Sequence, residues 1–235
     1  MKKRIWELDV LRGICILAMV AVHLVFDLVY IYGVLTLAGF GQWLFNLLTQ
    51  WGGVLFLLIS GICVTLGSHP VRRGLTVFGC GMVCTLATCL MYWLGFMDQS
   101  VIIYFGVLHC LGICMLLWPL VKKLPAWALG ILGVLLAAVG LYLPNLRVDT
   151  PWLIPLGLMY PGFASSDYFP LLPNLGFFLL GAVLGLTLYR KKQTLLPRVN
   201  EKNFMVRFFS VCGKWSLFIY LLHQPLITVA LELIF

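Results

Sequence analysis

The chain has 235 residues, of which 62% are hydrophobic and only 10% are charged. A soluble domain carries about 25% charged residues, so this composition excludes an ordinary soluble fold. Together with a mean hydropathy of +1.04, it predicts an all-α integral membrane protein. We interpret the net charge of +8 as basic residues that orient the chain in the membrane and contact anionic lipid. We expect no nucleic-acid partner.

Seven apolar stretches approach the roughly 20 residues that a membrane-spanning helix requires. They are 11–33, 43–66, 74–96, 102–121, 125–143, 170–189 and 215–235. We therefore expect one domain over residues 1–235, built as a single bundle of about seven transmembrane helices. The first apolar run lacks a small-residue cleavage site, so we expect it to remain as the first span.

The distribution of basic residues predicts the orientation of the chain. With a cytoplasmic N-terminus, all 16 Lys and Arg residues except Arg147 fall on the inner side. These are Lys2, Lys3, Arg4, Arg12, Arg72, Arg73, Lys122, Lys123 and the cluster from Arg190 to Lys214. The positive-inside rule thus predicts a multi-pass protein of the bacterial cytoplasmic (inner) membrane, with its N-terminus inside and its C-terminus outside.

Two connections are long. Segment 190–214 is basic, and it reads either as an interfacial helix on the cytoplasmic leaflet or as a linker with snorkelling side chains. Segment 144–169 faces outward in this topology, and its apolar part is too short to span. We expect this second segment to form a re-entrant or interfacial cap.

The first span carries ionisable residues on one helical face. At 100° per residue, His23 lies about 20° and Asp27 about 60° around the helix from Arg12. Arg12 and His23 are separated by roughly 16 Å along the axis. Because an ionisable group at bilayer depth costs about 2.5–3.5 kcal/mol, we expect this face to have a function. Arg12 alternatively snorkels or pairs with Asp9.

Asp27 follows His23 by one helical turn, which is the spacing of a general base and its orienting group. Other spans carry polar residues at comparable depths, and each histidine alternatively serves as an interhelical hydrogen-bonding group.

Pro225 is expected to kink the last span. The eight cysteines are expected to be packing residues, with no metal-binding spacing. The further polar candidates are Asn46, Gln50, His109, His223 and Gln224.

Motifs along nearly the whole chain carry a family resemblance. They are Leu8-Asp-Val-Leu-Arg-Gly13, Phe56-Leu-Leu-Ile-Ser-Gly61, Gly106-Val-Leu-His109, Asp167-Tyr-Phe-Pro-Leu-Leu-Pro173 and Ser216-Leu-Phe-Ile-Tyr-Leu-Leu-His-Gln-Pro225. In these motifs the chain resembles the bacterial branch of the heparan-α-glucosaminide N-acetyltransferase catalytic-domain family. The spacing of Arg12 and His23 is also similar to that in acyltransferase type 3 membrane proteins.

The resemblance implies an acyl-CoA-dependent acyltransferase without a metal cofactor. It would move an acyl group, typically acetyl, from cytosolic acyl-CoA to a hydroxyl or amine of a sugar or glycan on the other face. In the lysosomal member Asn stands where this chain has His23, so the role of His23 rests on the residues of this chain. The sequence leaves the oligomeric state, monomer or homodimer, open.

We assign roles within this reaction as follows. Arg12, Arg72 and Arg73 neutralise the donor phosphates, and His23, oriented by Asp27, acts as base or nucleophile. His109 or His223 donates to the oxyanion. The acceptor mouth is lined by Asn46, Gln50, Asp167 and Tyr168, with Gln224 nearby.

Two alternatives use the same residue types differently. One is a proton-coupled transporter with a His and Asp relay. The other is an accessory subunit that has lost catalysis. Arg12 near the cytoplasmic face and the lack of an internal repeat favour the enzyme.

Overall fold

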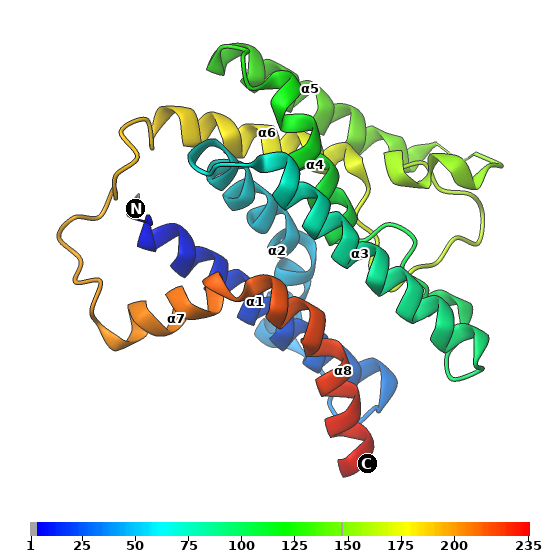
Figure 1. The fold of residues 1–235 in the computed structure, drawn as a ribbon. Helices are drawn as coiled ribbons and strands as arrows, with labels where there is room; N and C mark the ends of the chain where they lie inside the picture. The colour runs from blue at the N-terminus through cyan, green and yellow to red at the C-terminus, as the bar shows by residue number, and fades with distance from the viewer. Residues whose placement is uncertain (1–3, 147) are drawn as a thin grey trace. The chain divides into compact units, whose positions relative to one another are not determined.

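The computed structural model describes residues 4–146 and 148–235. Lys2, Lys3 and Arg147, which entered the charge pattern, lie outside the described residues. The described part of the chain is 73% helix and has no strands (Figure 1). This confirms the all-α class.

The described residues form eight α-helices and several short helical turns. Short turns of 3-10 helix lie at Gln99–Val101, Leu143–Asn145 and Pro151–Leu156. A π-helical turn, η1, at Asp27–Ile31 directly continues the first helix. The α-helices are α1 (Trp6–Phe26), α2 (Gly39–Leu66), α3 (Pro70–Trp93), α4 (Val107–Val121), α5 (Ala126–Tyr142), α6 (Leu171–Thr187), α7 (Phe204–Lys214) and α8 (Ser216–Ile234).

Five helical segments are long and apolar enough to cross a membrane, which confirms a membrane protein. They are Trp6–Ile31, Gly39–Leu66, Pro70–Trp93, Ala126–Asn145 and Ser216–Ile234. The other two expected spans correspond to α4 and α6, apolar helices of 15 and 17 residues. Helix α4 begins five residues later than expected because the preceding backbone pairs elsewhere: Phe169 N–H donates to Phe105 O at 2.9 Å.

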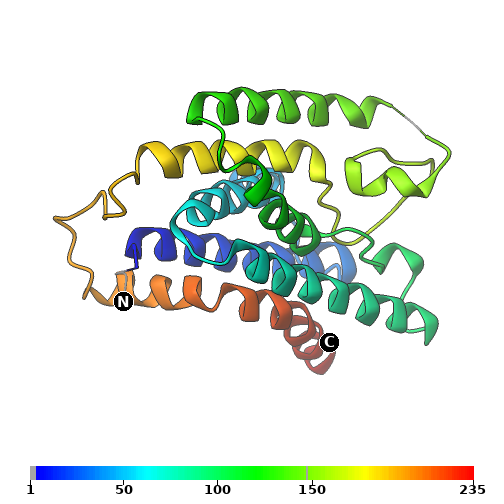
Figure 2. The same ribbon diagram turned by 45° about the horizontal axis from the view of Figure 1, so that its top comes forward.

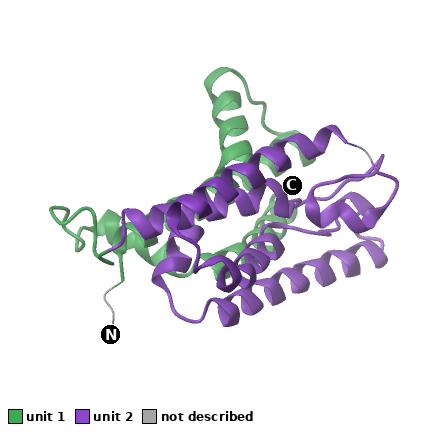
Figure 3. Ribbon diagram, turned by 90° about the horizontal axis from the view of Figure 1, so that it is seen from above, with its two compact units in different colours: residues 1–59, 191–235 green, residues 60–190 purple. Residues whose placement is uncertain are grey.

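The chain divides into two compact units, which are described separately (Figure 3). Unit 1 comprises residues 1–59 and 191–235, and unit 2 comprises residues 60–190. In unit 2, α5 lies beside α6 and α3 packs on α4 (Figure 2). Gly133 and Gly176 allow the backbones of α5 and α6 to approach closely, because a Cβ on Gly176 would lie 2.5 Å from Gly133 O.

In unit 1, α7 and α8 both pack against α1 (Figures 1 and 2). Gly13 of α1 lies directly against the backbone of α7, and Gly213 of α7 lies against the backbone of α1 at Asp9. Because both positions lack a side chain, the two helices meet backbone to backbone there. This contact fixes the segment after residue 203 against the start of the first span.

The two long connections are now defined. Residues 188–203 contain no helix, and the helical part of segment 190–214 is α7 alone. The described residues of segment 144–169 form no α-helix and only short 3-10 turns. Trp152 within it is 86% exposed, and the expectation of an interfacial or re-entrant cap stays a prediction.

Candidate functional site

A polar cluster lies between α1 and α8, inside two of the spanning segments. The imidazole rings of His23 and His223 meet edge to face, with centroids 4.8 Å apart. Asp27, at the start of η1, is 3% exposed, and its Oδ2 accepts a hydrogen bond of 2.8 Å from Gln224 Nε2. Four residues that the sequence marked as candidates are therefore brought together in unit 1.

The tautomer of His223 follows from its backbone contact. His223 Nδ1 lies 2.6 Å from the carbonyl oxygen of Tyr220, and a carbonyl oxygen only accepts. Nδ1 therefore carries the hydrogen in the neutral ring, and Nε2 is the nitrogen that takes up a proton. The ring orientation is fixed by this bond and by burial, since His223 is only 9% exposed.

Gln224 connects Asp27 to His23. Its amide nitrogen donates to Asp27, while its Oε1 atom is buried without a hydrogen bond to any described residue. The same side chain also interacts electrostatically with the His23 ring.

This arrangement differs from the direct His23–Asp27 contact that the sequence suggests. Within the described residues, the Asp27 carboxylate is hydrogen bonded to Gln224 and not to His23. Asp27 still lies one α-helical turn after His23, since its N–H donates to His23 O, and the helix widens into a π turn only beyond Asp27. The hydrogen-bond partner of the Asp27 carboxylate nevertheless comes from α8.

Arg12 joins the same two helices further toward the N-terminus. Its Nη2 donates a hydrogen bond of 2.7 Å to the hydroxyl of Ser216, which is 2% exposed. Asp9 Oδ2 lies 3.5 Å from Arg4 Nε, and Asp9 also interacts electrostatically with Arg12. The guanidinium retains further N–H donors beyond the one that Ser216 uses.

Glu7 is a buried carboxylate that the sequence analysis missed. It is 5% exposed, and its Oε1 accepts a hydrogen bond of 2.8 Å from the backbone N–H of Leu195. The bond anchors the connection between α6 and α7 to the start of α1. No local signal points to it, since the two residues are 188 positions apart.

Asn46 and Gln50 lie on the half of α2 that belongs to unit 1, and both are exposed. Asn46 Oδ1 accepts a hydrogen bond of 2.8 Å from Gln42 Nε2. Their expected place at an acceptor mouth stays a prediction.

His109 lies in unit 2, in the first turn of α4. Its Nδ1 accepts a hydrogen bond of 3.2 Å from the backbone N–H of Gly106. The hydroxyl of Thr85 donates to Ile103 O, so it accepts from His109 Nε2 at 3.2 Å. Both ring nitrogens are therefore used in holding the start of α4 against α3. This geometry favours a capping role over oxyanion stabilisation.

Asp167 and Tyr168 lie beside the same helix start. Asp167 Oδ2 accepts from the backbone N–H of Val107 at 3.1 Å, which satisfies a donor in the first turn of α4. The Tyr168 hydroxyl donates to Ile154 O at 2.8 Å, and burial raises the pKa of Tyr168 to about 12. The phenol is therefore neutral at physiological pH and acts there as a donor.

Arg72 and Arg73 occupy the first turn of α3, after the connection from α2. Arg72 is exposed, and its backbone carbonyl accepts from the hydroxyl of Thr76 at 3.0 Å. The guanidinium of Arg73 lies against Gly67 in the connection. Among the described residues, no three His, Cys, Asp or Glu side chains come together as a metal site requires.

A titratable cluster enclosed between two spanning helices is the architecture of a membrane-embedded enzyme or of a proton-coupled transporter. The comparisons with known proteins decide between these classes. Residues 4–225 match the family described as heparan-alpha-glucosaminide N-acetyltransferase, catalytic, and the chain belongs to this family. Membership indicates a membrane acetyltransferase. No curated protein and no solved structure matches the chain.

Proposed function

We propose that the protein transfers an acetyl group from cytosolic acetyl-CoA to a hydroxyl or amine of a sugar or glycan on the opposite side of the bacterial cytoplasmic membrane. The main support for this proposal is the cluster of His23, His223, Gln224 and Asp27 between two spanning helices. Membership of an acetyltransferase family favours this reaction over proton-coupled transport by the same residue types.

The donor enters from the side of the N-terminus in this proposal. The distribution of Lys and Arg assigns that side to the cytoplasm, where CoA is made. Arg12 is held toward α8 by Ser216 and has donors left for a phosphate. Arg72 and Arg73 face the same compartment by the same charge rule and are further candidates for the phosphates.

The helical rise from Arg12 to His23, roughly 16 Å, suits an extended pantetheine arm. With its phosphates at Arg12, the donor places its thioester carbonyl near the histidine pair. The acceptor reaches the same point from outside, where we expect Asn46 and Gln50 of unit 1 to contribute to the approach.

His23 acts as the general base in this mechanism. The acceptor oxygen or nitrogen attacks the thioester carbonyl, His23 takes the proton that the acceptor loses, and the carbon–sulfur bond breaks to release CoA as thiolate. Gln224, held by Asp27, keeps the imidazole aligned. His223 lies beside His23 and, when protonated at Nε2, donates to the developing oxyanion in this mechanism.

Replacing His23 with Ala tests the assignment. General base catalysis contributes about 10² to 10⁴ in rate, so the purified variant is expected to lose at least about 10² in acetyl transfer. The matched control is His69→Asn, at an exposed histidine with a φ of 57° that Asn tolerates. Transfer by purified His23→Ala protein close to that of the wild type overturns the proposal.

A covalent route uses the same histidine as nucleophile. Incubation of the protein with radiolabelled acetyl-CoA, without acceptor, separates the two. Label that remains on denatured wild-type protein but not on His23→Ala protein identifies an acetyl-histidine. Direct transfer leaves both proteins unlabelled.

A further inference from the structure

The outward side of α7 and the start of α8 form one apolar stripe. Phe204, Phe208 and Val211 recur at intervals of four and three residues, which places them on one face of α7. Trp215 follows four residues later, in the turn between α7 and α8. All four are exposed, from 45% for Val211 to 77% for Phe204. The opposite side of α7 carries the buried Ser210 and Gly213 and packs on α1. The helix is thus apolar on its exposed side.

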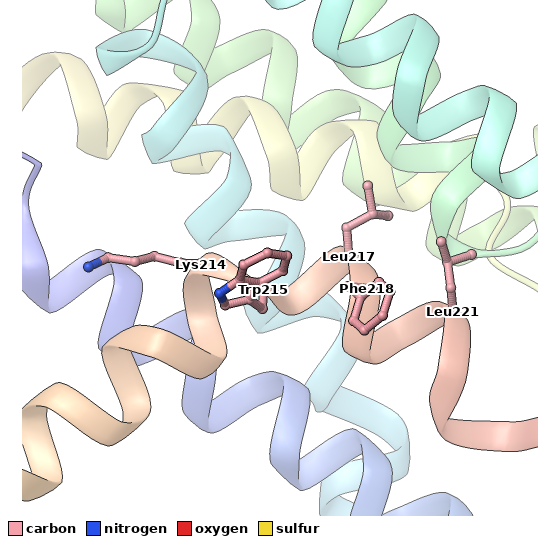
Figure 4. A pocket seen from close by; sticks show the side chains of 5 residues that line it. All are labelled: Lys214, Trp215, Leu217, Phe218 and Leu221. Carbon is pink, nitrogen blue, oxygen red and sulfur yellow. The ribbon is translucent and has the colours of Figure 1, made fainter. Parts of the chain in front are cut away.

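Two open depressions lie along this stripe, and each has one cation in its lining. The first, of about 300 Å³, is lined by Phe204, Arg207, Phe208 and Val211. The second, of about 260 Å³, is lined by Lys214, Trp215, Leu217, Phe218 and Leu221 (Figure 4). Arg207 and Lys214 are seven residues apart, so both cations lie near one edge of the same helical face.

The point along α1 at which α7 packs places α7 at a membrane boundary. An 11-residue helix is roughly 16 Å long and cannot cross a hydrocarbon core of about 30 Å. Gly213 touches α1 at Asp9, in the part of α1 that carries Glu7, Asp9 and Arg12. Charged residues gather there because the apolar part of the span begins after them.

An apolar surface beside an exposed cation suits a phospholipid, because the acyl chains can pack on the aromatic rings while the phosphate binds the cation. We propose that the face of Phe204, Arg207, Phe208, Val211, Lys214 and Trp215 binds anionic phospholipid of the leaflet on the N-terminal side. Charge complementarity favours lipid over a second copy of this chain, because a copy would bring the same two cations to the contact.

Tryptophan quenching by brominated lipid tests the proposal on the full chain in vesicles. Brominated phosphatidylglycerol should quench more strongly than brominated phosphatidylcholine, and Trp215→Phe should remove that difference. Arg207→Gln and Lys214→Gln should each lower the preference for phosphatidylglycerol about fivefold, which corresponds to about 1 kcal/mol per cation. Lys214→Arg should retain it.

The matched control is Lys122→Gln with Lys123→Gln, which removes two basic residues that line neither depression. This double variant should leave the preference for phosphatidylglycerol unchanged. Added acetyl-CoA should also leave it unchanged, because a site for lipid phosphate is not the site for the donor phosphates. Equal quenching by both lipids, or a Trp215 signal that neither lipid quenches, overturns the proposal. In the second case, crosslinking of a Phe208→Cys variant to itself would identify a second copy as the occupant.

Discussion

Gln224 of α8 donates a hydrogen bond of 2.8 Å to the buried carboxylate of Asp27, at the residue where α1 changes to a π-helical turn. The bond joins the first and last spanning segments within unit 1. Gln224 also interacts electrostatically with His23, and in the proposed mechanism it aligns this base.

Replacing Gln224 with Ala should both destabilise the protein and slow transfer. Asp27 would lose its donor while remaining buried, which costs about 1–3 kcal/mol. The melting temperature should fall by roughly 2–4 °C for each kcal/mol. Gln99→Ala, at an exposed glutamine bonded to Tyr104 at 3.3 Å, is the control and should change neither quantity. An unchanged melting temperature of Gln224→Ala would contradict the role of this bond.

Replacing Arg12 with Gln should act on donor binding. If the guanidinium holds a phosphate of acyl-CoA, the KM for the donor rises at least about tenfold, since a charge-assisted hydrogen bond contributes about 1.5–3 kcal/mol. The kcat should change less, because the reacting atoms lie roughly 16 Å away. Steady-state kinetics with varied acetyl-CoA measure both. Arg198→Gln, at an exposed arginine, is the control, and a fall in kcat at constant KM would argue against phosphate binding.

Replacing Gly213 with Ala should separate α7 from α1. The new Cβ would meet the backbone carbonyl of Asp9, which cannot move cheaply, and overpacking of this kind costs about 1–3 kcal/mol. Gly79→Ala on α3 is the matched control, because nothing lies within 4 Å of its Cβ. That control should be neutral or stabilised by about 0.5–1 kcal/mol. Thermal unfolding of both variants in detergent measures the difference, and equal stability would refute the backbone contact.

Replacing His109 with Ala should lower stability more than it lowers the activity of the folded protein. The variant leaves the Gly106 N–H without its acceptor and the Thr85 oxygen without the His109 donor, at a cost of about 1–3 kcal/mol. The check is transfer activity per folded molecule beside the melting temperature. A variant with normal melting temperature and at least about 10²-fold slower transfer would instead assign His109 to the chemistry.

The positions of the spans were predictable because hydropathy is a local property of the chain. The helices found at Trp6–Ile31, Gly39–Leu66 and Ser216–Ile234 lie where the apolar stretches predict them. The start of α4 was not predictable in this way. Residues 102–106 are apolar, yet their backbone pairs with the loop around Tyr168, and hydropathy contains no information on that pairing.

The candidate site was predictable as a set of residue types and not as a set of contacts. His23, Asp27, His223 and Gln224 stand out because polar residues in apolar helices are costly and need a reason. The expected partner of Asp27 was His23, since helical spacing is the only geometry a sequence displays. The observed partner is 197 positions away.

By itself, therefore, the sequence determined that the chain is an all-α membrane protein, which residues on its spans are polar, and which family motifs it carries. Only the tertiary structure decided that Gln224 binds Asp27, that Glu7 anchors Leu195, and that His109 caps α4. The physical reason is the same in each case. Hydropathy and helical phase act between neighbours along the chain, whereas these hydrogen bonds depend on which helices pack together and on where a helix begins.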